Sequence, residues 1–211
     1  MKKNIVVSIA VLAVVGVVGS ATSVYAALTD STLFSQQINA GTLSTFIGDA
    51  SGVDVASPNV VFPAQTVSNA VQTSAGTYGT NTERIYVDNP GGGDNGWTLS
   101  FAATSGASAT WTSGGNTYPF NAATSALGQL TINATPGTLT AVVGTTTGIT
   151  KGTSGTFSGG ANTPISLLAA AAGSDNIARV YLTGVTASQT IPASQVAGSY
   201  TIDFTQTAVA L

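Results

Sequence analysis

The sequence contains neither cysteine nor histidine in its 211 residues. Without cysteine the chain cannot form disulfides, use thiol chemistry or carry a lipid-modified cysteine. Without either residue it also lacks the usual zinc sites and the Ser-His-acid catalytic arrangement. The fold must therefore obtain its stability from a packed core.

Charged residues are also scarce, at 6% of the chain. Two of the five basic residues, Lys2 and Lys3, lie at the extreme amino terminus, which leaves three basic residues against eight acidic ones. Phosphate backbones require clustered Lys and Arg, so we predict no nucleic-acid partner. So low a charge protects a dispersed monomer poorly and favours an assembled or wall-associated state.

The amino terminus has the three parts of a secretory signal peptide. Lys2 and Lys3 are followed by the apolar run 5–18 and by the small-residue site Val24-Tyr25-Ala26. We predict cleavage after Ala26 and an extracellular or cell-surface protein that is not a membrane protein after cleavage. The alternative is a retained anchor, but the run is shorter than the ~20 residues of a membrane span.

The rest of the chain is rich in Thr, Ser, Ala and Gly, which suits strands and glycine turns better than long helices. We expect residues 41–211 to form a single all-β domain, an antiparallel β-sandwich or jelly roll of about ten to twelve strands. Residues 144–163 are interpreted as a long loop or a poorly paired edge. Residues 165–172 fit either a strand or a single helical turn.

The clearest pattern is Glu83–Phe101. Ile85 and Val87 share one face of a first strand, and Trp97, Leu99 and Phe101 share one face of a second. The turn between them contains Pro90 and a run of glycines, so we predict a β-hairpin. Trp97, Leu99 and Phe101 are the predicted core anchors.

Weaker strand patterns occupy much of the remaining chain. The predicted strands are 59–62, 67–78, 110–112 with 118–120 as a hairpin, 129–133, 138–143, 176–185 and 199–211.

Residues 27–40 are predicted to be an extended segment with an alternating pattern. Its predicted apolar face contains Leu28, Thr32, Phe34, Ile38 and Ala40. Such a segment can be donated to a neighbouring subunit as a polymerisation strand, or it can fold back as an edge strand on its own sheet.

Some residues suggest local chemistry. Asp88, Asp94 and Asn95 could supply oxygen ligands to Ca²⁺, although Asp and Asn are also ordinary turn formers. No other cofactor is indicated.

Other side chains suggest binding or crosslinking rather than catalysis. Trp111 lies between threonines and is the candidate glycan contact, whereas Trp97 has the pattern of a core residue. Lys151 could in principle form an isopeptide crosslink. Paired acids could hydrolyse a glycoside, but the acids here lie mostly beside turn residues.

Two stretches resemble secreted bacterial families. The junction Val24–Asp30 with Ile38–Leu43 resembles the fibre-forming TasA and camelysin group. Val87-Asp88-Asn89 through Gly96–Leu99 is similar to the first motif of WxL-type surface proteins, and residues 191–193 and 197–201 match that family's later strand. The second W-x-L is absent, because residues 202–206 contain no tryptophan.

These resemblances imply two functions. The first is a secreted, non-enzymatic subunit that binds copies of itself in an extracellular filament or surface assembly, through donor-strand exchange by residues 27–40. The alternative is a surface module that binds cell-wall polysaccharide.

Overall fold

The computed structural model describes residues 32–39, 41–91, 95–173 and 178–211. The predicted signal peptide, as well as Leu28 and Ala40, lies outside the described residues. The described part forms fourteen strands and two 3-10 turns, η1 (Gly106–Ser108) and η2 (Ser125–Leu127). The strands are β1 (Ser44–Gly48), β2 (Gln72–Tyr78), β3 (Arg84–Asn89), β4 (Trp97–Ala103), β5 (Thr110–Ser113), β6 (Asn116–Pro119), β7 (Leu130–Asn133), β8 (Thr138–Val143), β9 (Ile149–Lys151), β10 (Gly155–Thr156), β11 (Ile165–Ala170), β12 (Ala178–Thr183), β13 (Val185–Ile191) and β14 (Phe204–Ala210).

The strands of the described residues form three four-stranded sheets and one hairpin, all antiparallel. Sheet A has the order β1-β3-β12-β8, sheet B the order β2-β13-β7-β10, and sheet C the order β14-β4-β11-β9. The hairpin is β5-β6.

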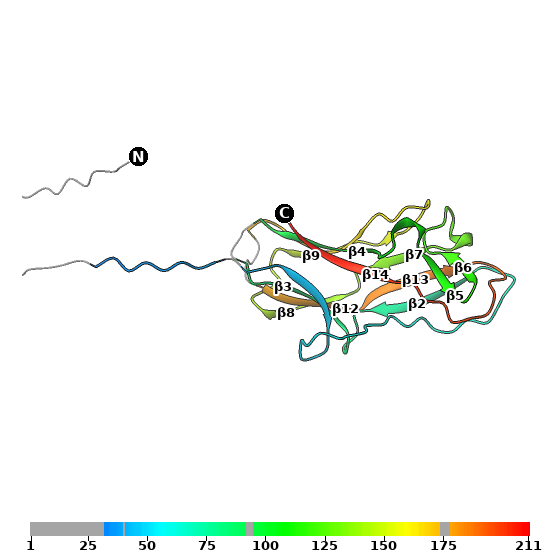
Figure 1. Cartoon of the computed structure of the whole chain (residues 1–211), viewed down its shortest axis with the longest axis horizontal. Helices are drawn as coiled ribbons and strands as arrows, with labels where there is room; N and C mark the ends of the chain where they lie inside the picture. Colours follow the sequence, from blue (N-terminus) through cyan, green and yellow to red (C-terminus); the bar gives the residue numbers. More distant parts are fainter. Residues whose placement is uncertain (1–31, 40, 92–94, 174–177) are drawn as a thin grey trace, which may run out of the picture. The chain divides into compact units, whose positions relative to one another are not determined.

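Sheets A and B form one layer of a sandwich. The described chain passes directly between these two sheets four times, from β1 to β2, from β2 to β3, from β7 to β8 and from β12 to β13. Gly184 alone separates β12 from β13, and its φ of 75° is a conformation that glycine adopts without a steric penalty. Sheet C and the β5-β6 hairpin form the second layer (Figure 1). The predicted antiparallel β-sandwich is therefore confirmed.

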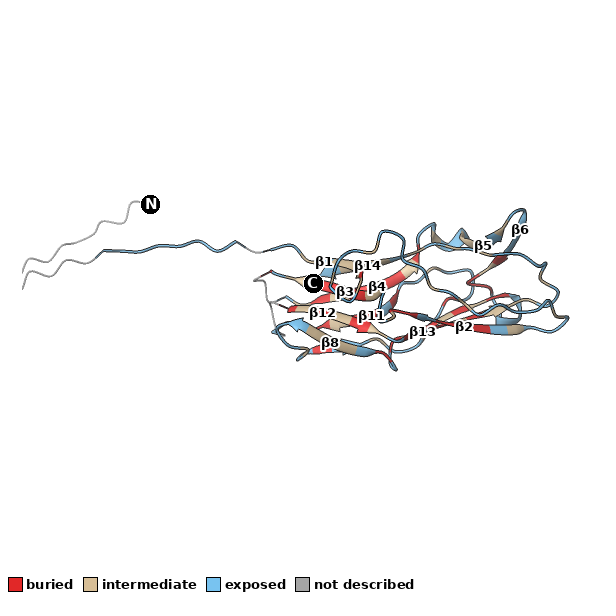
Figure 2. Cartoon of the chain, turned by 90° about the horizontal axis from the view of Figure 1, so that it is seen from below, coloured by how far each residue is buried: buried red, intermediate tan, exposed pale blue. Residues whose placement is uncertain are grey.

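The core lies between these layers, and buried residues alternate with more exposed ones along β2, β4, β7, β12 and β13 (Figure 2). Trp97, Leu99 and Phe101 of β4 are 2%, 0% and 7% exposed, so they are the core anchors that the sequence predicts. The Phe101 ring stacks on Phe204 of β14 with 4.7 Å between centroids, and it lies 5.1 Å from Tyr78 of β2. Aromatic packing thus joins sheet C to sheet B.

The predicted hairpin of Glu83–Phe101 is wrong. β3 pairs with β1 and β12 in sheet A, whereas β4 pairs with β11 and β14 in sheet C. The connection between β3 and β4 therefore crosses from one layer to the other. Both strands still turn an apolar face inward, because each layer presents that face to the same core.

Several other strands differ from the sequence interpretation. Residues 165–172 form a strand, β11, rather than a helical turn. Residues 144–163 contain the short strands β9 and β10, which are the outer strands of sheets C and B. Of the two interpretations from the sequence, a long loop or a poorly paired edge, the edge is therefore the better description. β13 was not predicted, although it lies between β2 and β7 in sheet B.

One predicted strand is absent from the structure, and another is shorter than predicted. Residues 59–62 are extended but belong to no strand, and residues 199–203 contribute only an isolated bridge between Thr201 and Thr112 before β14 begins. Pro58 and Pro63 flank the first of these segments, and proline has no backbone donor for a ladder.

Candidate functional site

A groove of about 570 Å³ opens at the end of the sandwich formed by sheet B and the β5-β6 hairpin. One wall is the extended segment 59–68, and the opposite wall is the loop 195–201. The floor comes from the ends of β2 and β13 and from Trp111 and Tyr118 of the hairpin. None of the described residues that line the groove is charged.

Four aromatic rings line the groove in a row. Phe62 meets Trp111 edge to face at 5.6 Å, Trp111 stacks on Tyr118 at 6.0 Å, and Tyr118 meets Tyr200 edge to face at 5.1 Å. Such arrangements are favourable geometries for aromatic pairs, and they stiffen the groove.

Trp111 is held in place by a buried amide. Its Nε1 donates a hydrogen bond of 2.9 Å to Oε1 of Gln189, which is 1% exposed, and Nε2 of Gln189 donates to the Thr190 carbonyl at 2.7 Å. The polar edge of the indole is therefore already satisfied. Trp111 was predicted to be exposed, but it is half-buried and stacked on Tyr118, so it offers a poor platform for a sugar ring.

The wall formed by residues 60–67 presents an unpaired backbone. Its residues make no backbone-to-backbone hydrogen bond to any other described residue. The Pro63 carbonyl instead accepts a hydrogen bond of 2.9 Å from Oγ of Ser74. The segment lies close against β2, because a Cβ on Gly76 would come within 2.9 Å of the Val61 carbonyl oxygen. Glycine at position 76 permits this contact.

The groove also gathers exposed valines. Val61, Val67 and Val196 are 71%, 55% and 54% exposed, and all three line it. A concentration of apolar side chains on one surface of a soluble domain is typical of an interaction site.

The groove raises the pKa of a tyrosine. Burial, with a further contribution from the neighbouring Tyr200, raises the pKa of Tyr118 to about 12 from its ordinary value of about 10. Burial also raises the pKa of Tyr78, in the core, well above that value.

These shifts predict loss of stability at alkaline pH. A phenol whose pKa is raised on folding contributes stability that is complete below about pH 10 and disappears as the pH rises toward about 12. Urea unfolding across this range should show a falling free energy of unfolding, with a smaller fall in Tyr118→Phe. An identical pH dependence in that variant would contradict a role for Tyr118.

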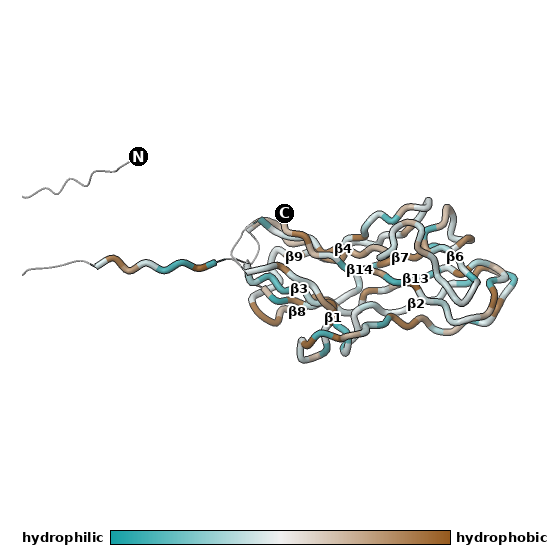
Figure 3. Tube along the Cα trace, in the orientation of Figure 1, coloured by the Kyte–Doolittle hydropathy of each residue, from teal (hydrophilic) through white to brown (hydrophobic). Residues whose placement is uncertain are grey.

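The amino-terminal segment 32–39 has a different character. It is extended and assigned to no strand, and each of its residues is exposed. Leu33, Phe34 and Ile38 are 91%, 90% and 87% exposed. Figure 3 shows hydrophobic and hydrophilic stretches along it. Among the described residues, no sheet therefore includes this segment as a folded-back edge strand.

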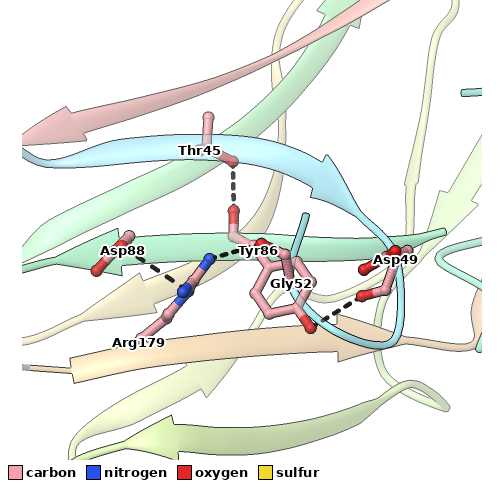
Figure 4. Close-up of polar contacts among 6 residues, drawn as sticks. All are labelled: Thr45, Asp49, Gly52, Tyr86, Asp88 and Arg179. Atoms are coloured by element: carbon pink, nitrogen blue, oxygen red, sulfur yellow. Dashed lines mark hydrogen bonds and ion pairs between the residues drawn. The ribbon is translucent and has the colours of Figure 1, made fainter. Parts of the chain in front are cut away.

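The proposed calcium ligands Asp88, Asp94 and Asn95 are only partly described by the structure. Asp94 lies outside the described residues. Asp88 faces Arg179, with 3.8 Å between its Oδ2 and Nε of the arginine (Figure 4). In the described ranges, no group of three or more acidic, His or Cys side chains could hold a metal ion. Asp88 is better explained as the partner of Arg179.

Arg179 organises the outer face of sheet A (Figure 4). Its Nη2 donates a hydrogen bond of 2.9 Å to the Gly52 carbonyl, and its guanidinium lies 5.3 Å from the ring centroids of both Phe46 and Tyr86. Tyr86 Oη in turn donates to the Asp49 carbonyl at 3.2 Å. These contacts fix the loop between β1 and residue 55 against the sheet.

Lys151 lies on β9, not in the loop that the sequence suggests. Its Nζ donates hydrogen bonds to the carbonyls of Thr135 and Gly137, at 2.6 and 2.5 Å. These contacts hold the turn between β7 and β8. Among the described residues, no salt bridge joins Lys151 to a carboxylate with which it could form an isopeptide bond.

Comparison of the chain with protein-family models, with curated proteins and with solved structures finds no match. Across the described ranges, none of the helices has the length and apolar character needed to cross a membrane.

Proposed function

We propose that the chain is a secreted, non-enzymatic structural protein, whose copies assemble into an extracellular filament or surface assembly through the amino-terminal segment 27–40. The observation that carries this proposal is the exposure of Leu33, Phe34 and Ile38 in an extended segment that belongs to no sheet. Three such side chains are costly to leave in water when a neighbouring copy can bury them.

The energetic argument is favourable. Burying one large apolar side chain contributes roughly 1.5–3 kcal/mol, so Phe34 and Ile38, which share one face of an extended strand, contribute roughly 3–6 kcal/mol toward the cost of association. Asp30 is the one charged side chain of residues 27–40, and burial of residues 31–40 requires no desolvation of ions. As an added strand, it would also pair with backbone groups at an edge that otherwise invites uncontrolled pairing.

The matched pair Phe34→Asp and Ser35→Asp tests this proposal. Both variants add one negative charge to the same segment, but only the first removes an apolar side chain and would bury an unpaired carboxylate. We expect the mature wild-type protein and Ser35→Asp to form oligomers, and Phe34→Asp to assemble at least ~100-fold more weakly. Sedimentation over a concentration series measures this, and negative-stain microscopy shows the particles.

Two outcomes would contradict the proposal. One is a wild-type protein that is monodisperse at every concentration and is unchanged when residues 27–40 are deleted. The other is assembly of Phe34→Asp at wild-type strength.

A wall- or glycan-binding module is the other candidate from the sequence. The stacking of Trp111 on Tyr118 and the bond of its Nε1 to Gln189 leave that residue poorly placed to contact a sugar. Assembly is therefore the function that the geometry supports better.

A further inference from the structure

We infer that the groove between residues 59–68 and 195–201 receives the amino-terminal segment, residues 28–40, of a second copy of this chain. The inference rests on the proposed function and adds the receiving site, the polarity of the assembly and the residues that control it.

The first argument is position within the sandwich. Gly41 lies against Pro90, and β1 begins at Ser44 opposite Asp88, so the segment leaves the domain at the end of sheet A where β12 starts. The groove lies where β13 ends, because Ile191 lines it. β12 and β13 run consecutively from Ala178 to Ile191, a path of roughly 40 Å at about 3.3 Å per residue.

The start of β1 and the end of β13 that lines the groove are thus at opposite ends of one layer. A segment that leaves one end and a site that opens at the other make a head-to-tail contact. Such a contact repeats from copy to copy, and it produces a polar filament when the rotation between copies does not close a ring.

The second argument is chemical match. The groove is uncharged and aromatic, with the exposed valines 61, 67 and 196 on it, and residues 31–40 of the segment are likewise uncharged. Phe34 and Ile38 lie on the same face of an extended chain, so both can enter the groove together. Neither the groove nor residues 31–40 leave an ion unpaired when they meet, and Asp30, the one charged side chain of residues 28–40, stays outside the groove in water.

The third argument is the available backbone. Residues 60–67 belong to no helix or strand and make no backbone-to-backbone hydrogen bond within the described part of the chain. A donated strand beside this wall would supply partners for those amides and carbonyls, with Pro63 as the one position that cannot donate.

Two exposed alanines allow the groove to be filled without disturbing the core. Ala64 lies on one wall and Ala197 on the other, and both are exposed. Ala197→Trp should occupy the groove, and Ala64→Trp repeats the test from the opposite wall. Ala123→Trp is the matched control, since Ala123 is also exposed but does not line the groove.

The decisive experiment mixes two defective full-length mature chains. Phe34→Asp keeps an open groove with a defective segment, and Ala197→Trp keeps the segment with a filled groove. We expect each alone to be monomeric under conditions where the wild type and Ala123→Trp polymerise. Their mixture should form one-to-one dimers and nothing longer, measured by sedimentation.

The outcomes separate this inference from the proposed function. If Ala197→Trp and Ala64→Trp polymerise like the wild type while Phe34→Asp does not, the segment is received elsewhere and the groove assignment is wrong. If the two defective chains fail to form dimers when mixed, the assignment is also wrong. If Phe34→Asp polymerises normally, the proposed function itself fails.

A binding measurement supplies a second readout. A labelled synthetic peptide of residues 28–40 should bind the Phe34→Asp chain, and at least ~10-fold more weakly when Ala197→Trp is added. Purified cell-wall polysaccharide is the competing probe. If the polysaccharide binds, Ala197→Trp abolishes that binding and the peptide does not bind, the groove is a glycan site and the inference is overturned.

Discussion

Replacing Trp97 with alanine is expected to lower the free energy of unfolding by about 3–5 kcal/mol, the largest effect we predict for a single core side chain. Trp97 is 2% exposed and opens β4, where it faces Ala170 of β11 on one side and Ala210 of β14 on the other. Its removal leaves a cavity between the layers that the surrounding strands fill only in part. Urea or thermal unfolding measures the loss.

Trp111→Ala is the matched comparison for this prediction. Trp111 is half-buried at the groove, so its truncation should cost clearly less than that of Trp97. Equal losses in the two variants, or a loss below about 1 kcal/mol for Trp97→Ala, would show that Trp97 is not the packing anchor of the sandwich.

Replacing Gly96 with alanine is expected to destabilise the fold by roughly 2–5 kcal/mol. Gly96 has a φ of 80°, where an L side chain costs roughly 1–2 kcal/mol. An added Cβ would also collide with the Ala170 carbonyl oxygen, and it would lie 3.0 Å from the backbone of Ala171. Relieving that overlap costs typically a further 1–3 kcal/mol.

Comparison with Gly106→Ala isolates the energetic cost of the steric overlap at Gly96. Gly106 has nearly the same φ, 78°, but nothing lies within 4 Å of a Cβ built there. We therefore expect Gly106→Ala to cost only the backbone strain, and chemical denaturation of the two variants measures the difference. Equal destabilisation would show that β11 moves away freely and that the crowding at Gly96 has no energetic consequence.

The alternation of side chains was readable from the sequence because it is a local property of an extended chain. Trp97, Leu99 and Phe101 were assigned to the core in this way, and all three are buried. The buried face of a strand can be predicted from this two-residue period without knowing which strand pairs with it.

Strand partners were not readable in the same way. The glycine-rich turn after β3 is compatible with a hairpin and with a crossing between layers, and both choices bury the same apolar faces. The choice depends on distant strands, since β12 pairs with β3 and β11 with β4. Hydrogen bonding between strands far apart in sequence decided it.

β13 was missed for a related reason. Its inward positions include Ala187 and Gln189, which make a weak apolar pattern. Gln189 is buried because its side chain meets the Trp111 indole and the Thr190 carbonyl. A buried amide becomes acceptable only when tertiary structure provides these partners.

The sequence by itself therefore determined an all-β chain with a core anchored at Trp97, and an amino-terminal segment that is uncharged over residues 31–40 and has apolar residues at Phe34 and Ile38. Only the tertiary structure decided that β3 and β4 belong to opposite layers, and that residues 59–68, 111, 118 and 195–201 surround one groove. The physical reason is that periodicity and charge act between neighbours in the chain, whereas sheet pairing and grooves are made by residues that meet only when the whole chain has packed.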